Sequence, residues 1–133
     1  MKKLLFMLPL LFFVSAIFAQ NQDPSSKRIL GNWYSKTNPN IKWTFTMDGR
    51  VYNYNQDRMA VMYKYTISHS CQNFTDDTAE FITLMDKDGN QFCFKINGIN
   101  ENKNGILSLT NLSNMQQLVF VNDASLKNTQ QIQ

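Results

Sequence analysis

The residues of this chain that could do chemistry are few, and the two cysteines stand out among them. Cys71 and Cys93 are the only thiols. In a chain that leaves the cytoplasm, a lone pair of cysteines most simply forms one disulfide. The rival interpretation, a redox or metal site, requires Cys-x-x-Cys spacing or a second histidine, and the sequence has neither. We therefore predict a Cys71–Cys93 disulfide and no metal ligands.

A second group of reactive side chains surrounds His69, the only histidine. Ser68, Ser70 and Asp76 stand close to it in the sequence, but a Ser/His/Asp triad is defined by its geometry and not by proximity along the chain. The segment 86–90 resembles a calcium loop, yet its glycine comes too early and no glutamate stands at the twelfth position, so it is interpreted as a turn. We expect no catalytic residues and no cofactor: the protein is predicted not to be an enzyme.

The amino terminus predicts export. Lys2 and Lys3 precede an apolar run, 4–18, that is shorter than the roughly 20 residues needed to span a bilayer. Small residues up to Ala19 suit cleavage there, so 1–19 is predicted to be a signal peptide. The alternative, an uncleaved membrane anchor, needs a longer apolar stretch and a positive flank beyond it. No cysteine near the cleavage point could carry a lipid, and we expect a secreted or periplasmic protein without a membrane anchor.

Removal of that signal changes the charge balance. The chain has 13 basic and 10 acidic residues, and loss of Lys2 and Lys3 leaves a net charge near +1. No cluster of Lys and Arg remains to follow a phosphate backbone, so nucleic acid is not an expected partner. The mature chain, 133 residues less 19, suits a single domain with one core.

The elements that position these residues are predicted to be strands. Residues 20–28 are polar and predict a flexible leader, with a possible helical turn at 28–30. From 41 to 47, apolar and polar residues alternate, as in a strand with one buried face. Asp48-Gly49 then predicts a hairpin with a primed turn, because glycine tolerates positive φ. Further strands are expected at 50–55, 59–68, 79–85, 91–97, 106–110 and 117–121, and no convincing helical period follows the signal.

About eight strands joined by short connections predict an all-β fold, an antiparallel up-and-down barrel over 29–122 as a single domain. A half-open sandwich is the alternative. The tail 123–133 is too polar to predict an ordered element. Since Phe92 and Phe94 take the inward phase of their strand, Cys93 should point outward, and the disulfide should tie the polar loop 69–77 to the outer wall. By closing the chain segment 71–93 into a loop, the disulfide should stabilise the fold by about 3 kcal/mol.

The start of the first strand resembles a known family. Gly31-Asn32-Trp33 is similar to the opening motif of lipocalins and the wider calycin superfamily, and the sequence through Trp43-Thr44-Phe45 to Asp48-Gly49 resembles small lipocalin-like secreted proteins of Gram-negative bacteria. The resemblance implies that Gly31 and Trp33 are structural and that Trp33 closes one end of the barrel.

The inward aromatic residues allow two interpretations. They could line an apolar cavity for a small hydrophobic ligand, with tyrosine hydroxyls as polar contacts, or simply fill a small barrel. The first makes the protein a ligand-binding lipocalin-like protein. The second makes it a secreted protein-binding module, for example an inhibitor of an extracellular enzyme that uses the loop 69–77. The candidate ligand-binding residues are Trp43, Phe45, Tyr63, Tyr65, Phe92 and Phe94, and Phe81 and Phe120 are expected to face inward with them.

Overall fold

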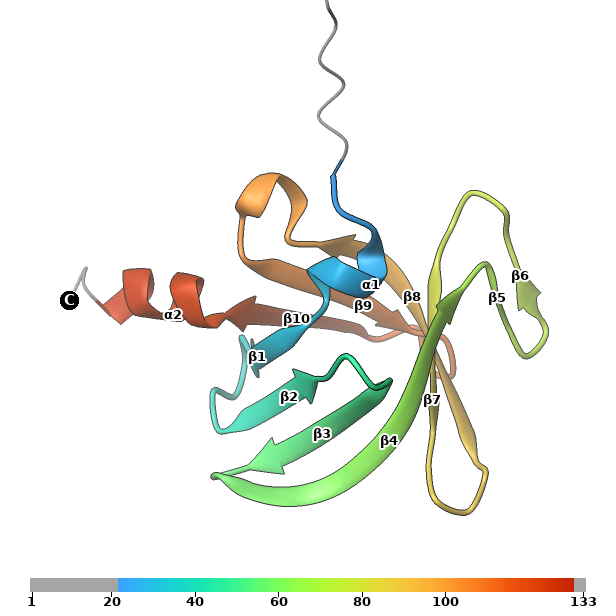
Figure 1. The fold of residues 1–133 in the computed structure, drawn as a ribbon, viewed down its shortest axis with the longest axis horizontal. Helices are drawn as coiled ribbons and strands as arrows, with labels where there is room; N and C mark the ends of the chain where they lie inside the picture. Colours follow the sequence, from blue (N-terminus) through green and yellow to red (C-terminus); the bar gives the residue numbers. More distant parts are fainter. Residues whose placement is uncertain (1–21, 131–133) are drawn as a thin grey trace, which may run out of the picture.

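Eight antiparallel strands close into one barrel, which confirms the predicted all-β fold (Figure 1). The computed structural model describes residues 22–130; the predicted signal peptide, 1–19, falls outside them. Around the barrel the strands follow the order β1-β10-β9-β8-β7-β4-β3-β2, so each pairs with its sequence neighbour and β10 closes onto β1. Their bounds are β1 (Gly31–Ser35), β2 (Ile41–Phe45), β3 (Arg50–Asn55), β4 (Arg58–Ser68), β7 (Phe81–Met85), β8 (Gln91–Ile99), β9 (Ile106–Asn111) and β10 (Gln117–Asn122).

One pair of strands lies outside this ring. Between β4 and β7 the chain forms a small separate hairpin of β5 (Ser70–Cys71) and β6 (Phe74–Thr75), which projects from the barrel wall in Figure 1. The sequence predicted only a polar loop here. Two strands of two residues each are too short to show an alternating pattern, which explains why the hairpin could not be seen in the sequence.

The hairpin at Asp48-Gly49 is present, but its turn differs from the predicted primed turn. The strand before it ends at Phe45, and the Gly49 N–H donates to the Thr46 carbonyl. Gly49 has φ +80, whereas Asp48 keeps a negative φ. This is the three-residue loop with glycine in the left-handed position, which the same Asp-Gly pair also permits. As a result Met47, expected to face inward, lies in the turn and is 90% exposed.

A short helix covers one end of the barrel. The helix α1 (Ser25–Arg28) comes just before the predicted turn at 28–30, within the segment expected to be a flexible leader. The Ser25 hydroxyl donates to Glu80 at 2.6 Å, and the Arg28 guanidinium donates to the Ile99 carbonyl at 2.7 Å. These bonds to β8 and to the segment before β7 hold the helix on the barrel. Ile29 after the helix is fully buried.

Helical structure also follows the last strand. The helix α2 (Asp123–Gln130) continues from β10 and extends away from the barrel in Figure 1. Asn122 begins it, since its side-chain oxygen accepts a hydrogen bond from the Ser125 N–H at 2.9 Å. The sequence predicted a helical turn at 28–30 and no ordered element after residue 122; the helix lies instead at 25–28, and the polar tail does form one. Neither helix has an apolar period that the sequence could show, because α1 is too short and α2 is polar. No helix within residues 22–130 is long and apolar enough to cross a membrane.

The core is formed by the inward residues of the barrel and by Ile29, which follows α1. Trp33 is 2% exposed, and its indole N–H donates to the Ile29 carbonyl at 2.7 Å, so the ring is fixed beneath the turn that follows α1. Gly31 opens β1 with φ +109, a conformation that glycine reaches without strain. The other buried members of the core are Trp43, Phe45, Val51, Ile82, Leu84, Phe94, Ile99, Leu107, Leu109 and Phe120.

Candidate functional site

The disulfide between Cys71 and Cys93 is present, as predicted. It joins the β5–β6 hairpin to β8 on the outside of the barrel. Cys93 stands between Phe92 and Phe94 in the strand, and both cysteines belong to a small cluster separate from the barrel core. The Thr83 hydroxyl donates to the Cys71 sulfur at 3.0 Å, which adds a contact to β7. The hairpin is thus attached to two neighbouring strands.

Phe81 belongs to this outer cluster and not to the barrel interior. It is 4% exposed and packs with the two cysteines. The prediction that it faces inward is wrong, because the residues of β7 that reach the core are Ile82 and Leu84. The strand starts at Phe81 rather than at residue 79, and its inward phase is the one set by Ile82.

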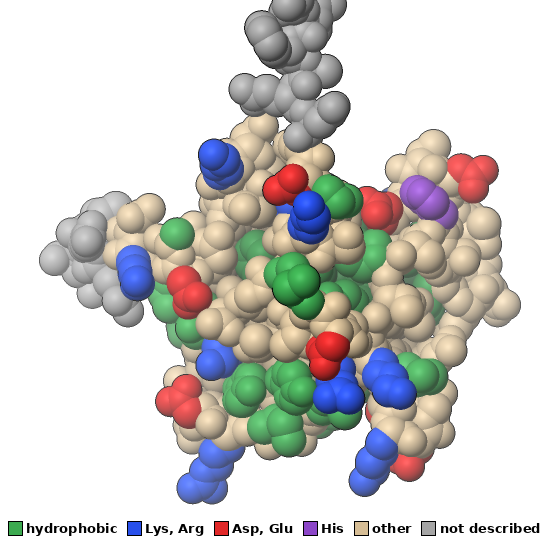
Figure 2. All heavy atoms as spheres, in the orientation of Figure 1, with side chains coloured by type: hydrophobic (Ala, Val, Ile, Leu, Met, Phe, Trp, Pro, Cys, Tyr) green, Lys and Arg blue, Asp and Glu red, His purple; other side chains and the backbone are tan. Residues whose placement is uncertain are grey.

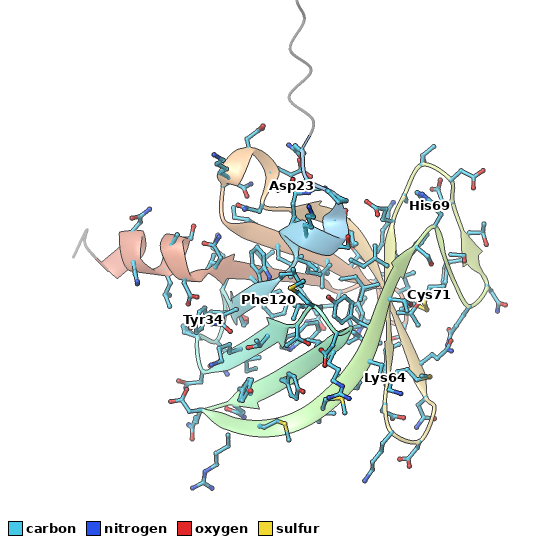
Figure 3. The ribbon with its side chains drawn as sticks, viewed as in Figure 1. Asp23, Tyr34, Lys64, His69, Cys71 and Phe120 are labelled. Carbon is cyan, nitrogen blue, oxygen red and sulfur yellow. A yellow bond between two sulfur atoms is a disulfide. The ribbon has the colours of Figure 1, made fainter. Side chains whose placement is uncertain are left out.

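The polar residues around His69 hold the base of the hairpin. His69 Nδ1 is hydrogen-bonded to the Ala79 carbonyl at 2.7 Å. The Asp76 carboxylate accepts from the hydroxyl and the backbone N–H of Thr78, and these bonds lower the Asp76 pKa. The Asp76 N–H in turn donates to the His69 carbonyl at 3.0 Å. His69 and Cys71 are labelled in Figure 3, where they mark the side of the barrel that carries the hairpin.

A groove of about 100 Å³ separates the hairpin from the barrel. Phe74 on β6 and Phe92 on β8 border it together with Leu112, which follows β9. Phe74 is 43% exposed and Phe92 is 44% exposed. Two large rings on one small groove form an apolar site in an otherwise polar region, which includes Gln72, Gln91, Asn111 and Ser113.

The middle of the barrel is crossed by aromatic side chains. Trp43 on β2 meets Phe94 on β8 with ring centroids 5.8 Å apart, and meets Phe120 on β10 at 4.9 Å. Strands β2 and β8 stand opposite each other in the ring of strands, so the Trp43 ring spans the barrel at this level. Phe45 packs against Trp43 at 6.2 Å, toward the end covered by α1.

The two inward tyrosines have different environments. The Tyr65 hydroxyl donates to the Thr46 carbonyl at 3.0 Å, and burial, with a smaller contribution from Asp48, raises the Tyr65 pKa. This hydroxyl is therefore occupied within the fold. Tyr63 lies nearer the other end of the barrel and meets the Phe92 ring edge to face at 5.9 Å. Of the predicted ligand-binding residues, Trp43, Phe45 and Phe94 are buried in the interior, Tyr63 and Tyr65 are partly buried against it, and Phe92 reaches the surface.

A second, polar groove of about 400 Å³ runs beside α1. Its walls include Arg28 and Glu101, joined by an ion pair of 3.1 Å, and the hydrogen bond from Arg28 lowers the Glu101 pKa. Arg28 also donates to the Asp23 carbonyl at 2.8 Å. Because these groups already hold α1 on the barrel, we interpret them as part of its attachment.

Within residues 22–130, no three His, Cys, Asp or Glu side chains are grouped so that they could hold a metal ion. Comparison of the chain with protein family models, with curated proteins and with solved structures found no match. The closed eight-stranded barrel is compatible with a lipocalin-like fold, and no comparison assigns the chain to that family.

The disulfide should contribute measurably to stability. Replacing both Cys71 and Cys93 with serine should lower the free energy of unfolding by about 3 kcal/mol, because the unfolded chain gains the freedom of the opened loop. Denaturant unfolding of the oxidised protein and of the double variant would measure the loss. Thr83→Val removes only the hydroxyl contact to Cys71 and serves as the control, with an expected change of about 1 kcal/mol or less. Equal stability of the serine variant and the oxidised protein would contradict the prediction.

Proposed function

We propose that this protein is a non-enzymatic binding module that acts outside the cytoplasm and binds a protein partner with its disulfide-held hairpin. One observation supports this above the others: Phe74 on the hairpin and Phe92 on the barrel are both about half exposed and border the same groove. Exposed aromatic residues around a pocket are typical anchors of protein interfaces.

The attachment of the hairpin supports the same function. A loop that is rigid before binding loses less conformational entropy when its partner arrives, so more of the contact energy remains as affinity. The disulfide fixes β5, and the bonds of His69 and Asp76 fix both ends of the segment. The disulfide and the predicted signal peptide both fit an oxidising compartment.

A site-specific cross-linker at Phe74 tests the proposal. A photoreactive phenylalanine placed there should form a covalent adduct with one secreted or periplasmic protein. As a control, the photoreactive phenylalanine placed at position 106 should not give that adduct; Ile106 is 37% exposed and begins β9. With the partner purified, Phe74→Ala should weaken binding by about 10-fold or more, the usual effect at an aromatic anchor. Stability should change by less than about 0.5 kcal/mol. Equal adducts from both positions, or unchanged affinity, would contradict a hairpin site.

A second candidate function is the binding of a small apolar ligand at the end of the barrel opposite α1. It is favoured by the Tyr63–Phe92 ring pair, which reaches the surface there, and by Val61, which is 37% exposed. Because Trp43 contacts Phe94 and Phe120 across the middle of the barrel, this ligand would bind only at the barrel end beyond those rings.

A further inference from the structure

The outer wall of the barrel carries a strip of apolar side chains, although the outward positions of an alternating strand are ordinarily polar. On β3 the inward residue is Val51, so Tyr52 and Tyr54 point outward, where a barrel exposed to water ordinarily presents polar side chains. Neither ring is fully buried. Their centroids are 6.5 Å apart. Figure 2 shows hydrophobic side chains gathered over the region of β3 and β4, with Lys and Arg and some Asp and Glu side chains around them.

Strand pairing extends this strip across the neighbouring strands. Tyr52 stands directly opposite Met62 on β4, and Met85 on β7 is the partner of Lys64. A groove of about 180 Å³ lies at that end, bordered by Met62 and Met85 together with Lys64, Lys87 and Asp86. We call Tyr52, Tyr54, Met62 and Met85 the outer strip. It is a partly exposed apolar surface that ends in a groove with two lysines and one aspartate at its edge.

Cations accompany the outer strip along its length. The Lys42 ammonium lies 4.6 Å from the centre of the Tyr54 ring, and Lys64 projects beside the strip between β4 and β7 (Figure 3). None of the strands β2, β3, β4 and β7 contains an acidic residue. The acids of this side lie in the turns at the strand ends: Asp48 pairs with Arg50 at 3.7 Å, and Asp86, directly after β7, borders the groove beside Lys64 and Lys87. The wall itself is therefore apolar and positively charged.

We propose that the outer strip binds the surface of an anionic phospholipid bilayer. Tyrosine prefers the interface between water and hydrocarbon because its ring is apolar and its hydroxyl polar. Methionine adapts to an irregular apolar surface. Lysine can lay its carbon chain along apolar groups while its ammonium reaches phosphate. The charge of the wall complements anionic headgroups, and each nearby cation contributes attraction that salt weakens. This site is on a different part of the barrel from the hairpin groove, so either proposal can fail without the other.

Sedimentation with lipid vesicles tests this proposal on the purified protein. Vesicles of phosphatidylcholine with about a third phosphatidylglycerol should bind the protein, and vesicles of phosphatidylcholine alone should bind it much more weakly. The double variant Lys42→Gln/Lys64→Gln should bind the anionic vesicles about 30-fold more weakly, at roughly a factor of five for each cation lost. Lys103→Gln/Lys127→Gln removes the same charge from exposed positions outside the strip and should change binding less than about 3-fold.

Salt separates the apolar contribution from the charge. Binding that remains at about 1 M salt, where charges are screened within about 3 Å, should come from the outer strip. Tyr52→Ser/Met62→Ser should remove this remainder, and a circular dichroism spectrum would show that the variant is folded.

Three results would overturn the proposal. The first is an equal loss of binding in the Lys103/Lys127 control, which would indicate attraction by net charge alone. The second is displacement by excess free glycerol phosphate, which would indicate a simple anion site. The third is no vesicle binding while an acidic peptide or a single-stranded oligonucleotide binds in a manner that depends on Lys42 and Lys64.

Discussion

Replacing Trp33 with alanine should lower the free energy of unfolding by about 3 to 5 kcal/mol, as for other large buried aromatic residues. The ring is 2% exposed and packs beneath Ile29, which is itself fully buried. Its loss would leave a void at the end of the barrel and remove the donor of the 2.7 Å bond to the Ile29 carbonyl. Denaturant unfolding, followed by circular dichroism, would measure the change.

Two variants separate the causes of this loss. Trp33→Phe keeps most of the packing but leaves the Ile29 carbonyl without its donor, so it should cost about 1 to 3 kcal/mol. Phe74→Ala removes an aromatic ring that is 43% exposed and should cost less than about 0.5 kcal/mol. A loss below about 1 kcal/mol in Trp33→Ala, in the range of surface positions, would mean that the residue does not close the barrel and that the resemblance of Gly31-Asn32-Trp33 to the lipocalin motif is accidental.

The barrel was predictable because its signals are local. Alternation in 41–45 and 91–97, together with the turns at Asp48-Gly49 and at 86–90, which contains Asp88-Gly89, defines hairpins without knowledge of distant contacts. The helices lack such signals. The helix α1 has a single turn, and its position is set by hydrogen bonds to distant parts of the chain: Ser25 bonds to Glu80, 55 positions further along, and Arg28 bonds to Ile99, 71 positions further along. Contacts across such separations cannot be read from the pattern of one segment.

The candidate sites were predictable in part. The number of cysteines was enough to predict the disulfide. The inward phase of Phe92 and Phe94 was enough to predict that the disulfide lies on the outside of the barrel. The groove was not predictable, because Phe74, Phe92 and Leu112 come from three segments that only the closed barrel brings together. The outer strip did have a signal in the sequence. In β3 either Val51 or Tyr52 could face inward by the apolar pattern alone. Val51 pairs with the buried Phe45 and faces the core, so Tyr52 faces outward.

The interior of the barrel gives the second large effect. Trp43→Ala should also cost about 3 to 5 kcal/mol, since Trp43 is 9% exposed and its ring contacts two strands besides its own. The loss should be accompanied by a new property. Removing the ring that spans from β2 to β8 would open an apolar void, and apolar voids of this kind stay dry and accept small apolar molecules.

Binding of a benzene-sized probe by Trp43→Ala, and not by the native protein, is therefore the expected result, with calorimetry of the folded variant as the measurement. Trp43→Leu opens a smaller void, so it should lose less stability and bind the probe more weakly; it keeps the test open if the alanine variant does not fold.

A fluorescent fatty-acid probe on the native protein completes the experiment. Micromolar binding that quenches tryptophan fluorescence, and that Tyr63→Ala or Phe92→Ala weakens, would show that the aromatic residues separate to admit a ligand. The small-ligand function would then replace the hairpin-bound protein partner as the better supported role, because a filled barrel is the condition that favours a surface partner.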